Sequence, residues 1–187
     1  MTNNKTLQIV LLVLIIIGLG LLATQKLWVG NVVNFILKYD KTKTVKNDPL
    51  NITYNVAGKY FRLVNGKAEK DNVAVFGQPV YGDLNGDGVS DAVMYLTENS
   101  GGSGTFFYVV EAINKGGVYK GTNAMFVGDR IAPQNIEIQK GVAVVNYADR
   151  NPGESFAVQP SLGKSIWVHL DEKNMEIGEL VQGYETR

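Results

Sequence analysis

The hydrophobic and polar positions divide the chain into three parts with different periods. Residues 7–23 form an almost continuous apolar run, and no charged residue occurs from position 6 to position 25. At about 1.5 Å per residue, the twenty uncharged residues make about 30 Å of helix, the thickness of a bilayer core. We therefore predict a transmembrane helix within residues 1–25. A cleaved signal peptide is disfavoured, because two leucines precede Ala23 where cleavage needs small residues.

The next segment, residues 26–41, has the period of an amphipathic helix, because polar residues recur every three or four positions opposite Trp28 and other apolar residues. Two arrangements fit this pattern: a helix on the bilayer surface, or a stalk that leaves it. Residues 40–51 are typical of a solvated linker, in which Pro49 ends any helix. The predicted organisation is an anchor at 1–25, a juxtamembrane helix or stalk with linker at 26–51, and a domain at 52–187.

From residue 52 onward, the pattern changes to short runs rich in β-branched and aromatic residues, separated by turn residues. The connections are too short for crossover helices, and Asn65–Gly66 and Lys140–Gly141 are expected to be tight turns. Runs such as 107–110 are apolar throughout, which is typical of strands buried on both faces. We predict an all-β domain, a mainly antiparallel sandwich or rolled sheet. The expected strands are 52–56, 60–64, 92–96, 105–113, 124–127, 136–139, 142–147, 165–170 and 175–181.

Composition and charge exclude several kinds of function. The chain has no cysteine and one histidine, His169, so disulfides, thiol catalysis and metal sites built from Cys or several His are excluded. The net charge is zero, but residues 1–46 carry six Lys or Arg against one acid, whereas residues 47–187 carry twelve against seventeen. A net-acidic domain lacks the basic face that nucleic-acid binding requires.

One glycine-rich loop, GDLNGDGVSD at residues 82–91, places oxygen ligands at alternate positions. Oxygens at the first, third and fifth positions converge when a chain wraps around a cation, and glycine at the sixth permits the sharp turn. Ligands that are all oxygen favour Ca²⁺ over transition metals. The expected ligands are Asp83, Asn85, Asp87, the backbone carbonyl of Val89, and Asp91.

Two alternatives to a calcium site fit these residues less well. An EF-hand would need glutamate at the twelfth position, where Met94 lies inside an expected strand, so Asp91 closes the site instead. A plain turn needs only two residues of this kind, and three unneutralised carboxylates within nine residues would repel one another. We therefore expect one structural Ca²⁺ ion in the loop.

The pattern D-x-N-x-D-G-x-x-D followed by an apolar strand resembles the calcium loop of FG-GAP/VCBS-type repeats, as in integrin-like β-propellers. The chain holds one copy, whereas a propeller needs several blades, so a propeller is not expected. Residues 5–170 also resemble an uncharacterised family of small membrane-anchored bacterial envelope proteins, in LLATQKLW, GDLNGDGVSD, GGSGTFFYVV, GTNAMFVGDRIAP and VNYADRNPGE. The resemblance implies a cell-envelope location and no particular activity.

Two further segments, GDRIAP at 128–133 and ADRNPGE at 148–154, each place an Asp-Arg pair at a strand end before a proline. If the strands between them form a hairpin, both pairs lie near one end of the sheet. Arg130 and Arg150 are then candidates to bind a carboxylate or phosphate of a partner, with Asp149 and Glu154 beside them. The alternative is that each pair only holds its own loop in place.

The favoured function is a membrane-anchored extracytoplasmic binding or structural module with one Ca²⁺ ion. Its partner would be an envelope protein, a second copy of the chain or a wall polymer. The alternative is a cell-envelope hydrolase with Asp149 and Glu154 as acid and base. An enzyme is not expected, since Ser103 and Ser161 lack the context of an activated nucleophile.

Two arguments about membrane orientation disagree. Four lysines follow the apolar run within residues 26–43, whereas Lys5 precedes it, so the positive-inside rule places the domain in the cytoplasm. A calcium site with a dissociation constant of about 10⁻⁴ M would stay empty at cytosolic calcium levels. Lysines of an interfacial helix would also meet anionic headgroups on either side. We expect a single-pass protein of the cytoplasmic membrane, with its amino terminus inside and the β domain outside.

Overall fold

The computed structural model describes residues 47–69, 72–99 and 101–180, which belong to one compact unit, Val45–Arg187. The anchor predicted at 1–25 and the helix or stalk predicted at 26–41 lie outside the described residues. Within the described part of the chain, no helix is long and apolar enough to cross a membrane.

Regular structure in the described residues is almost entirely β-strand, so the prediction of an all-β domain is confirmed. A short 3-10 helix, η1 (Pro49–Asn51), comes first and is capped by Asp48, whose carboxylate accepts a hydrogen bond from the Leu50 N–H at 3.0 Å. The strands are β1 (Thr53–Val56), β2 (Lys59–Val64), β3 (Lys67–Ala68), β4 (Val73–Gly82), β5 (Asp91–Glu98), β6 (Phe106–Lys115), β7 (Val118–Gly121), β8 (Met125–Asp129), β9 (Ala132–Gln139), β10 (Val142–Asp149), β11 (Leu162–Asp171) and β12 (Glu176–Glu179).

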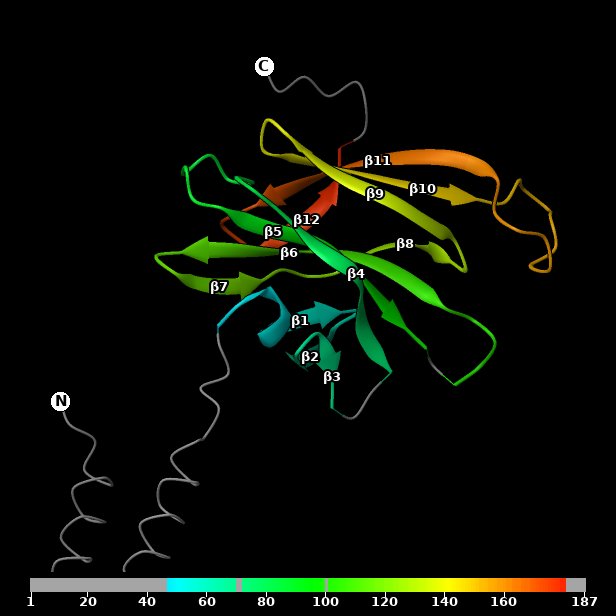
Figure 1. The fold of residues 1–187 in the computed structure, drawn as a ribbon, viewed down its shortest axis with the longest axis horizontal. Coiled ribbons are helices and arrows are strands. Elements are labelled where there is room, and N and C mark those ends of the chain that lie inside the picture. The colour runs from blue at the N-terminus through cyan, green and yellow to red at the C-terminus, as the bar shows by residue number, and fades with distance from the viewer. Residues whose placement is uncertain (1–46, 70–71, 100, 181–187) are drawn as a thin grey trace, which may run out of the picture. The chain divides into compact units, whose positions relative to one another are not determined.

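The first sheet rolls up into a nearly closed barrel (Figure 1). Its order is β1-β2-β3-β4-β5-β6-β7, with β8 beside the other half of β6, and paired strands are antiparallel. At the seam, the Asn55 N–H donates to the Thr122 carbonyl at 3.3 Å, and the Ala124 N–H donates to the Asn55 carbonyl at 2.6 Å. This short parallel bridge joins β1 to the segment between β7 and β8.

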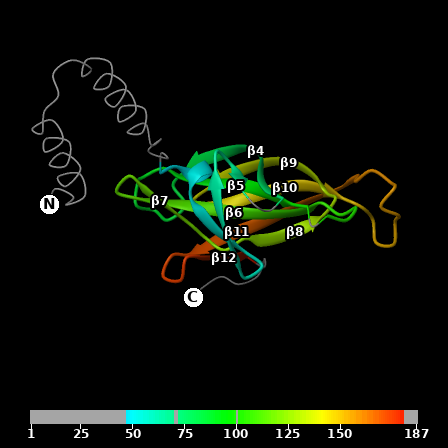
Figure 2. The ribbon, with the colours of Figure 1, turned by 90° about the horizontal axis from the view of Figure 1, so that it is seen from below.

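The second sheet, of order β12-β11-β10-β9, is antiparallel and packs on the outer face of β5 and β6 (Figures 1 and 2). Alternate residues of β5 therefore enter two different cores. Met94 packs inside the barrel with Tyr54, whereas Val93 packs between the sheets with Val145 and Val168. Burial on both faces explains why the runs 92–96 of β5 and 106–110 of β6 are apolar, as predicted.

The two turns expected from the sequence are present. Asn65 and Gly66 have φ of 52° and 79°, and Lys140 and Gly141 have φ of 51° and 78°. Positive φ at both central residues is the type I′ geometry that suits two-residue hairpins. The second turn joins β9 to β10 and approaches the loop before β5, because a Cβ atom on Gly141 would lie 3.5 Å from the Leu84 carbonyl oxygen.

Candidate functional site

The loop of residues 83–90 connects β4 to β5 and contains four of the five expected calcium ligands, and the fifth, Asp91, is the first residue of β5. Its backbone curls around the side chain of Asp83, whose two carboxylate oxygens accept hydrogen bonds from the N–H groups of Gly86 at 2.7 Å and Gly88 at 2.9 Å. Both glycines have φ near +80°, a conformation that other residues rarely adopt. The sharp turn expected at Gly88 is therefore present.

Two more side chains continue this curl. Asn85 Oδ1 accepts a hydrogen bond from the Asp87 N–H at 3.1 Å, and Asp87 Oδ1 accepts one from the Val89 N–H at 2.7 Å. The N–H groups, with that of Gly88 first, lower the pKa of Asp83 and so favour its charged form. The side chains at the first, third and fifth positions of the loop therefore each accept a hydrogen bond from a backbone N–H further along it, which produces consecutive turns.

Asp91 holds the loop against the barrel. Its side chain is completely buried, and its oxygens accept hydrogen bonds from the Leu84 N–H at 2.9 Å and the Asn114 N–H at 2.8 Å. Burial raises the pKa of Asp91, the two N–H groups lower it, and the nearby charges of Asp87 and Asp83 raise it again. A buried carboxylate beside two others is the arrangement that a bound cation relieves.

The donor set fits Ca²⁺ in chemistry, because all its side-chain ligands are oxygens. Each oxygen that accepts one N–H keeps a second lone pair for a cation. In the described residues, however, no group of three or more His, Cys, Asp or Glu side chains is gathered closely enough to hold a metal ion. Asp83, Asn85, Asp87, Val89 and Asp91 thus remain a predicted calcium site.

Glu172 is a residue of this region that sequence reasoning missed. It reaches the loop from the turn between β11 and β12, where Asn85 Nδ2 donates to Glu172 Oε1 at 3.5 Å. The same oxygen lies 2.7 Å from Lys115 Nζ. Because 87 residues separate Asn85 from Glu172 in the chain, no local pattern signals this approach.

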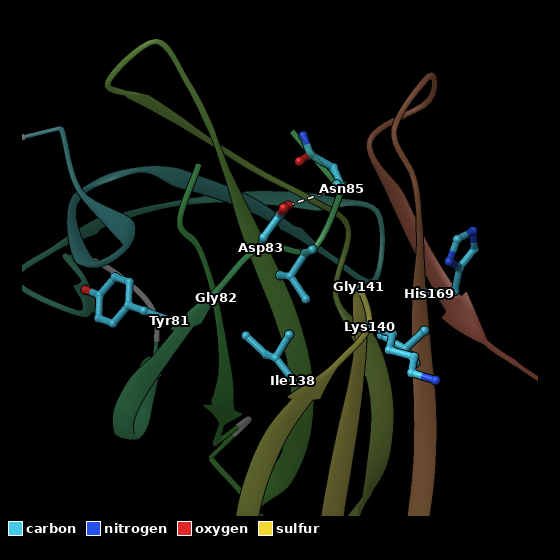
Figure 3. Close-up of a pocket in the computed structure, with 11 residues that line it drawn as sticks. Tyr81, Gly82, Asp83, Asn85, Ile138, Lys140, Gly141 and His169 are labelled. Atoms are coloured by element: carbon cyan, nitrogen blue, oxygen red, sulfur yellow. Dashed lines mark hydrogen bonds between the residues drawn. The ribbon is translucent and has the colours of Figure 1, made fainter. Parts of the chain in front are cut away.

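An open groove of about 760 Å³ lies beside the loop (Figure 3). The groove runs between residues 81–86, the β9–β10 hairpin and His169 of β11. Asp83 and Asn85 lie on one side, and Lys140 and His169 lie on the other, pointing away from the loop (Figure 3). At the floor, a Cβ atom on Gly82 would lie 2.8 Å from Ile138 Cδ1, so glycine permits the close approach of β4 and β9. No pattern in the sequence predicts this groove.

The two Asp-Arg pairs meet at the other end of the domain, as the hairpin argument predicted. Arg150 Nη1 donates to the Arg130 carbonyl at 2.8 Å, and Arg150 Nε donates to the Val158 carbonyl at 2.6 Å. Arg150 Nη2 also donates to the Phe156 carbonyl at 3.3 Å. Arg150 therefore organises the loop between β10 and β11 from within.

The remaining residues of this cluster also have partners within the domain. Arg130 pairs with its neighbour Asp129 at 2.7 Å and stacks on the Phe156 ring, 3.6 Å from its centroid. The ammonium of Lys164, 2.7 Å away, is the main cause that lowers the pKa of Asp149. Hydrogen bonds from Asn151 lower the pKa of Glu154. A general acid needs a raised pKa, so neither carboxyl group has the electrostatics of one.

Glu111 is a second residue that sequence reasoning missed. It lies on β6 opposite Val93, is 1 % exposed, and neither carboxylate oxygen has a hydrogen-bond partner among the described residues. Burial, with a smaller contribution from Asp91, raises the pKa of Glu111 to about 8. The signal was available, because Glu111 is the one charged residue in the apolar run 106–113.

Comparison with known proteins adds no family to these observations: no protein-family model, curated protein or solved structure matches the chain.

Proposed function

We propose that residues 52–187 form a calcium-stabilised binding module of the bacterial cell envelope. The observation that carries the proposal is the loop before β5, where Asp83, Asn85 and Asp87 wrap the backbone in register and Asp91 is buried beneath them. Without a cation, the third carboxylate adds charge repulsion to the loop besides the backbone hydrogen bonds that it accepts.

The calcium ion has a structural role in this proposal. Its ligands all lie within residues 83–91, and Asp91 links that loop to β6 through the Asn114 N–H. A cation that neutralises Asp91, Asp87 and Asp83 removes repulsion inside the fold and holds the end of β4 against the start of β5. The loop then forms a rigid wall of the groove beside it.

Binding is the activity that the surface supports best. The groove has hydrogen-bonding groups on one side and the cationic Lys140 and exposed His169 on the other. The Arg130 and Arg150 cluster has its polar groups paired within the domain, so it is a weaker candidate for recognition. Candidate partners are an envelope protein, a second copy of the chain and a wall polymer.

The proposed location is the outer side of the cytoplasmic membrane, with the apolar run at 7–23 as an uncleaved signal anchor. Two observations support it: the length of that run, and a loop of extracellular calcium-module type, for which dissociation constants are about 10⁻⁴–10⁻³ M.

The test is thermal unfolding of the full chain in calcium and in chelator. With calcium at about 100 times its dissociation constant, mass action adds about 2.7 kcal/mol of stability. Asp87→Ala should abolish the calcium-dependent shift. Asp171→Ala is the matched control, because Asp171 also accepts backbone N–H groups in a turn, at 3.0 Å from Lys173 and 3.4 Å from Asn174. An unchanged melting temperature for the unmodified chain in calcium and chelator would overturn the proposal.

A further inference from the structure

One end of the domain, which we call the Asn47 end, carries exposed apolar side chains around the point where the described chain begins. Tyr81 is 54 % exposed, Val89 is 39 % exposed, and Val118 is 51 % exposed. Figures 1 and 2 place η1, the start of β7 and the loop before β5 at the same end of the domain. The Asn47 end is defined here by Asn47, Tyr81, Val89, Val118 and Tyr119.

Two hydrogen bonds tie Asn47 and the loop before β5 to β7. The Tyr119 N–H donates to Asn47 Oδ1, which fixes Asn47 on β7 beside Val118. The Tyr119 hydroxyl donates to the Ser90 carbonyl at 3.2 Å, which holds the tip of the calcium loop, with Val89, against the same strand. Burial, with a smaller contribution from the nearby Tyr119, raises the pKa of Tyr81.

We propose that the Asn47 end docks on the phospholipid surface of the membrane, with Tyr81, Val89 and Val118 in the headgroup region. Tyrosine suits that region because its ring is apolar and its hydroxyl is polar, and aliphatic side chains beside it gain from leaving water. This inference rests on the proposed anchor and calcium loop.

The length of chain before Asn47 supports a bilayer as the occupant. Residues 26–46 span at most about 75 Å when fully extended, at about 3.6 Å per residue. A tether of that reach keeps the domain at an effective concentration on the order of millimolar at the surface. A contact too weak to recruit a free protein is then sufficient to orient this one.

Charge makes the docking depend on calcium where the membrane is anionic. Asp83 and Asp87 lie in the same loop as Val89, and without a cation their charges oppose an anionic headgroup layer. The β9–β10 turn, which carries Lys140, lies at the same end of the domain (Figure 1), whereas the charge of Lys115 at the end of β6 is paired with Glu172 at 2.7 Å. With calcium bound, Lys140 and the apolar residues act together.

The opposite end provides the internal control. Phe156 and Val158 in the loop between β10 and β11 are 54 % and 45 % exposed, so they are as apolar and as accessible as the Asn47 end. They lie at the far end of the domain from η1 (Figures 1 and 2). Nonspecific adsorption of exposed apolar side chains to lipid would shield both ends of the domain from water, whereas docking at the Asn47 end shields only that end.

The experiment uses the full chain, which contains no cysteine. Val118→Cys and Val158→Cys are spin-labelled separately and reconstituted in vesicles of equal parts phosphatidylcholine and phosphatidylglycerol. Accessibility to a water-soluble relaxation agent is then measured with calcium and with chelator. We expect the label at position 118 to lose accessibility in calcium and to regain it in chelator, and the label at position 158 to stay accessible throughout. Val89→Asp should abolish the protection at position 118.

The outcomes separate this inference from the calcium proposal. If both labels stay fully accessible while calcium still raises the melting temperature, docking is wrong and the calcium module stands. If position 158 is protected and position 118 is not, the opposite end faces the lipid and the inference is also wrong. If protection at position 118 persists in vesicles of phosphatidylcholine alone, with or without calcium, docking is supported and apolar contact is its main source.

Discussion

The side-chain amide of Asn123 and the backbone of Ile177 form a reciprocal pair of hydrogen bonds that joins the two sheets. Asn123 Nδ2 donates to the Ile177 carbonyl at 3.3 Å, and the Ile177 N–H donates to Asn123 Oδ1 at 2.6 Å. Asn123 also bridges to Asn55 at the seam of the barrel. One side chain therefore replaces a strand that would otherwise pair with the free edge of β12.

Asn123→Ala should lower the free energy of unfolding by about 2 kcal/mol, because the Ile177 N–H and carbonyl lose their partner in a largely buried setting. Denaturant unfolding measures the change. Asn135→Ala is the control, since Asn135 is exposed on β9 and its amide contacts only Glu137 among the described residues, at 2.9 Å. A loss for Asn123→Ala no larger than that of the control would show that the amide does not join the sheets.

We predict that the contribution of Glu111 to the free energy of unfolding falls as the pH rises. The folded pKa of about 8 lies above the ordinary value of 4.5, so the folded protein binds the proton more tightly than the unfolded chain. The contribution of Glu111 to the free energy of unfolding is then highest below pH 4.5, falls between pH 4.5 and about 8, and levels off above. At about 1.4 kcal/mol per pH unit, the full effect is on the order of 5 kcal/mol.

Replacing Glu111 with glutamine tests this directly. Glu111→Gln keeps the shape of the protonated acid and removes the ionisation, so it should be nearly neutral at pH 4.5 and stabilising above pH 8. Urea unfolding across that range measures the slope for the variant, for the unmodified protein and for Glu137→Gln, which changes an exposed carboxylate on β9. Equal slopes for all three proteins would mean that Glu111 ionises as freely as a surface glutamate.

Arg150 should contribute more to stability than Arg130. Arg150 donates to the carbonyls of Arg130, Val158 and Phe156, whereas Arg130 pairs with the adjacent Asp129 and stacks on Phe156. Arg150→Ala should cost about 1–3 kcal/mol, and Arg150→Lys should recover little, because an ammonium lacks the planar fork of donors. The cost of Arg130→Ala should be about 0.5–1 kcal/mol, mainly from its stacking.

Denaturant unfolding and limited proteolysis within residues 151–161 measure these effects. Arg62→Ala, on the exposed face of β2, is the control. Rapid cleavage in Arg150→Ala alone is the expected result. If cleavage and stability are unchanged in that variant, while association with an envelope partner is lost, Arg150 is a recognition residue and not an anchor.

Strands with strong local patterns were predictable from the sequence, and strands that depend on irregular pairing were not. The expected segments 92–96 and 142–147 lie within β5 and β10, because continuous apolar runs bounded by turn residues specify buried strands. β4 was missed, since Gly77 and Pro79 interrupt its run. The structure accommodates them in an irregularity between Phe76 and Val80, with φ of 75° at Gly77.

In the candidate site, too, local features were predictable and features that depend on tertiary packing were not. The order of Asp83, Asn85 and Asp87 is local, so the curl of the loop was predictable from spacing alone. The approach of Glu172 and the bond between Asp91 and the Asn114 N–H depend on tertiary packing. Closure of the barrel at Asn55 is likewise a contact between segments distant in sequence, for which no periodic pattern exists.

Labelling of single cysteines tests the proposed membrane orientation, because the cysteine-free chain gives no background. Ser161→Cys, in the exposed loop before β11, and Thr2→Cys, before the apolar run, are treated in intact cells with a membrane-impermeant maleimide. We expect Ser161→Cys to react and Thr2→Cys to react only after lysis, because a weak calcium loop is occupied only outside the cytoplasm. Val158→Cys should follow Ser161→Cys as a second reporter in the same loop. The reverse pattern would agree with the lysines of residues 26–43 and the positive-inside rule, and would place the three carboxylates of the loop where calcium is too scarce to neutralise them.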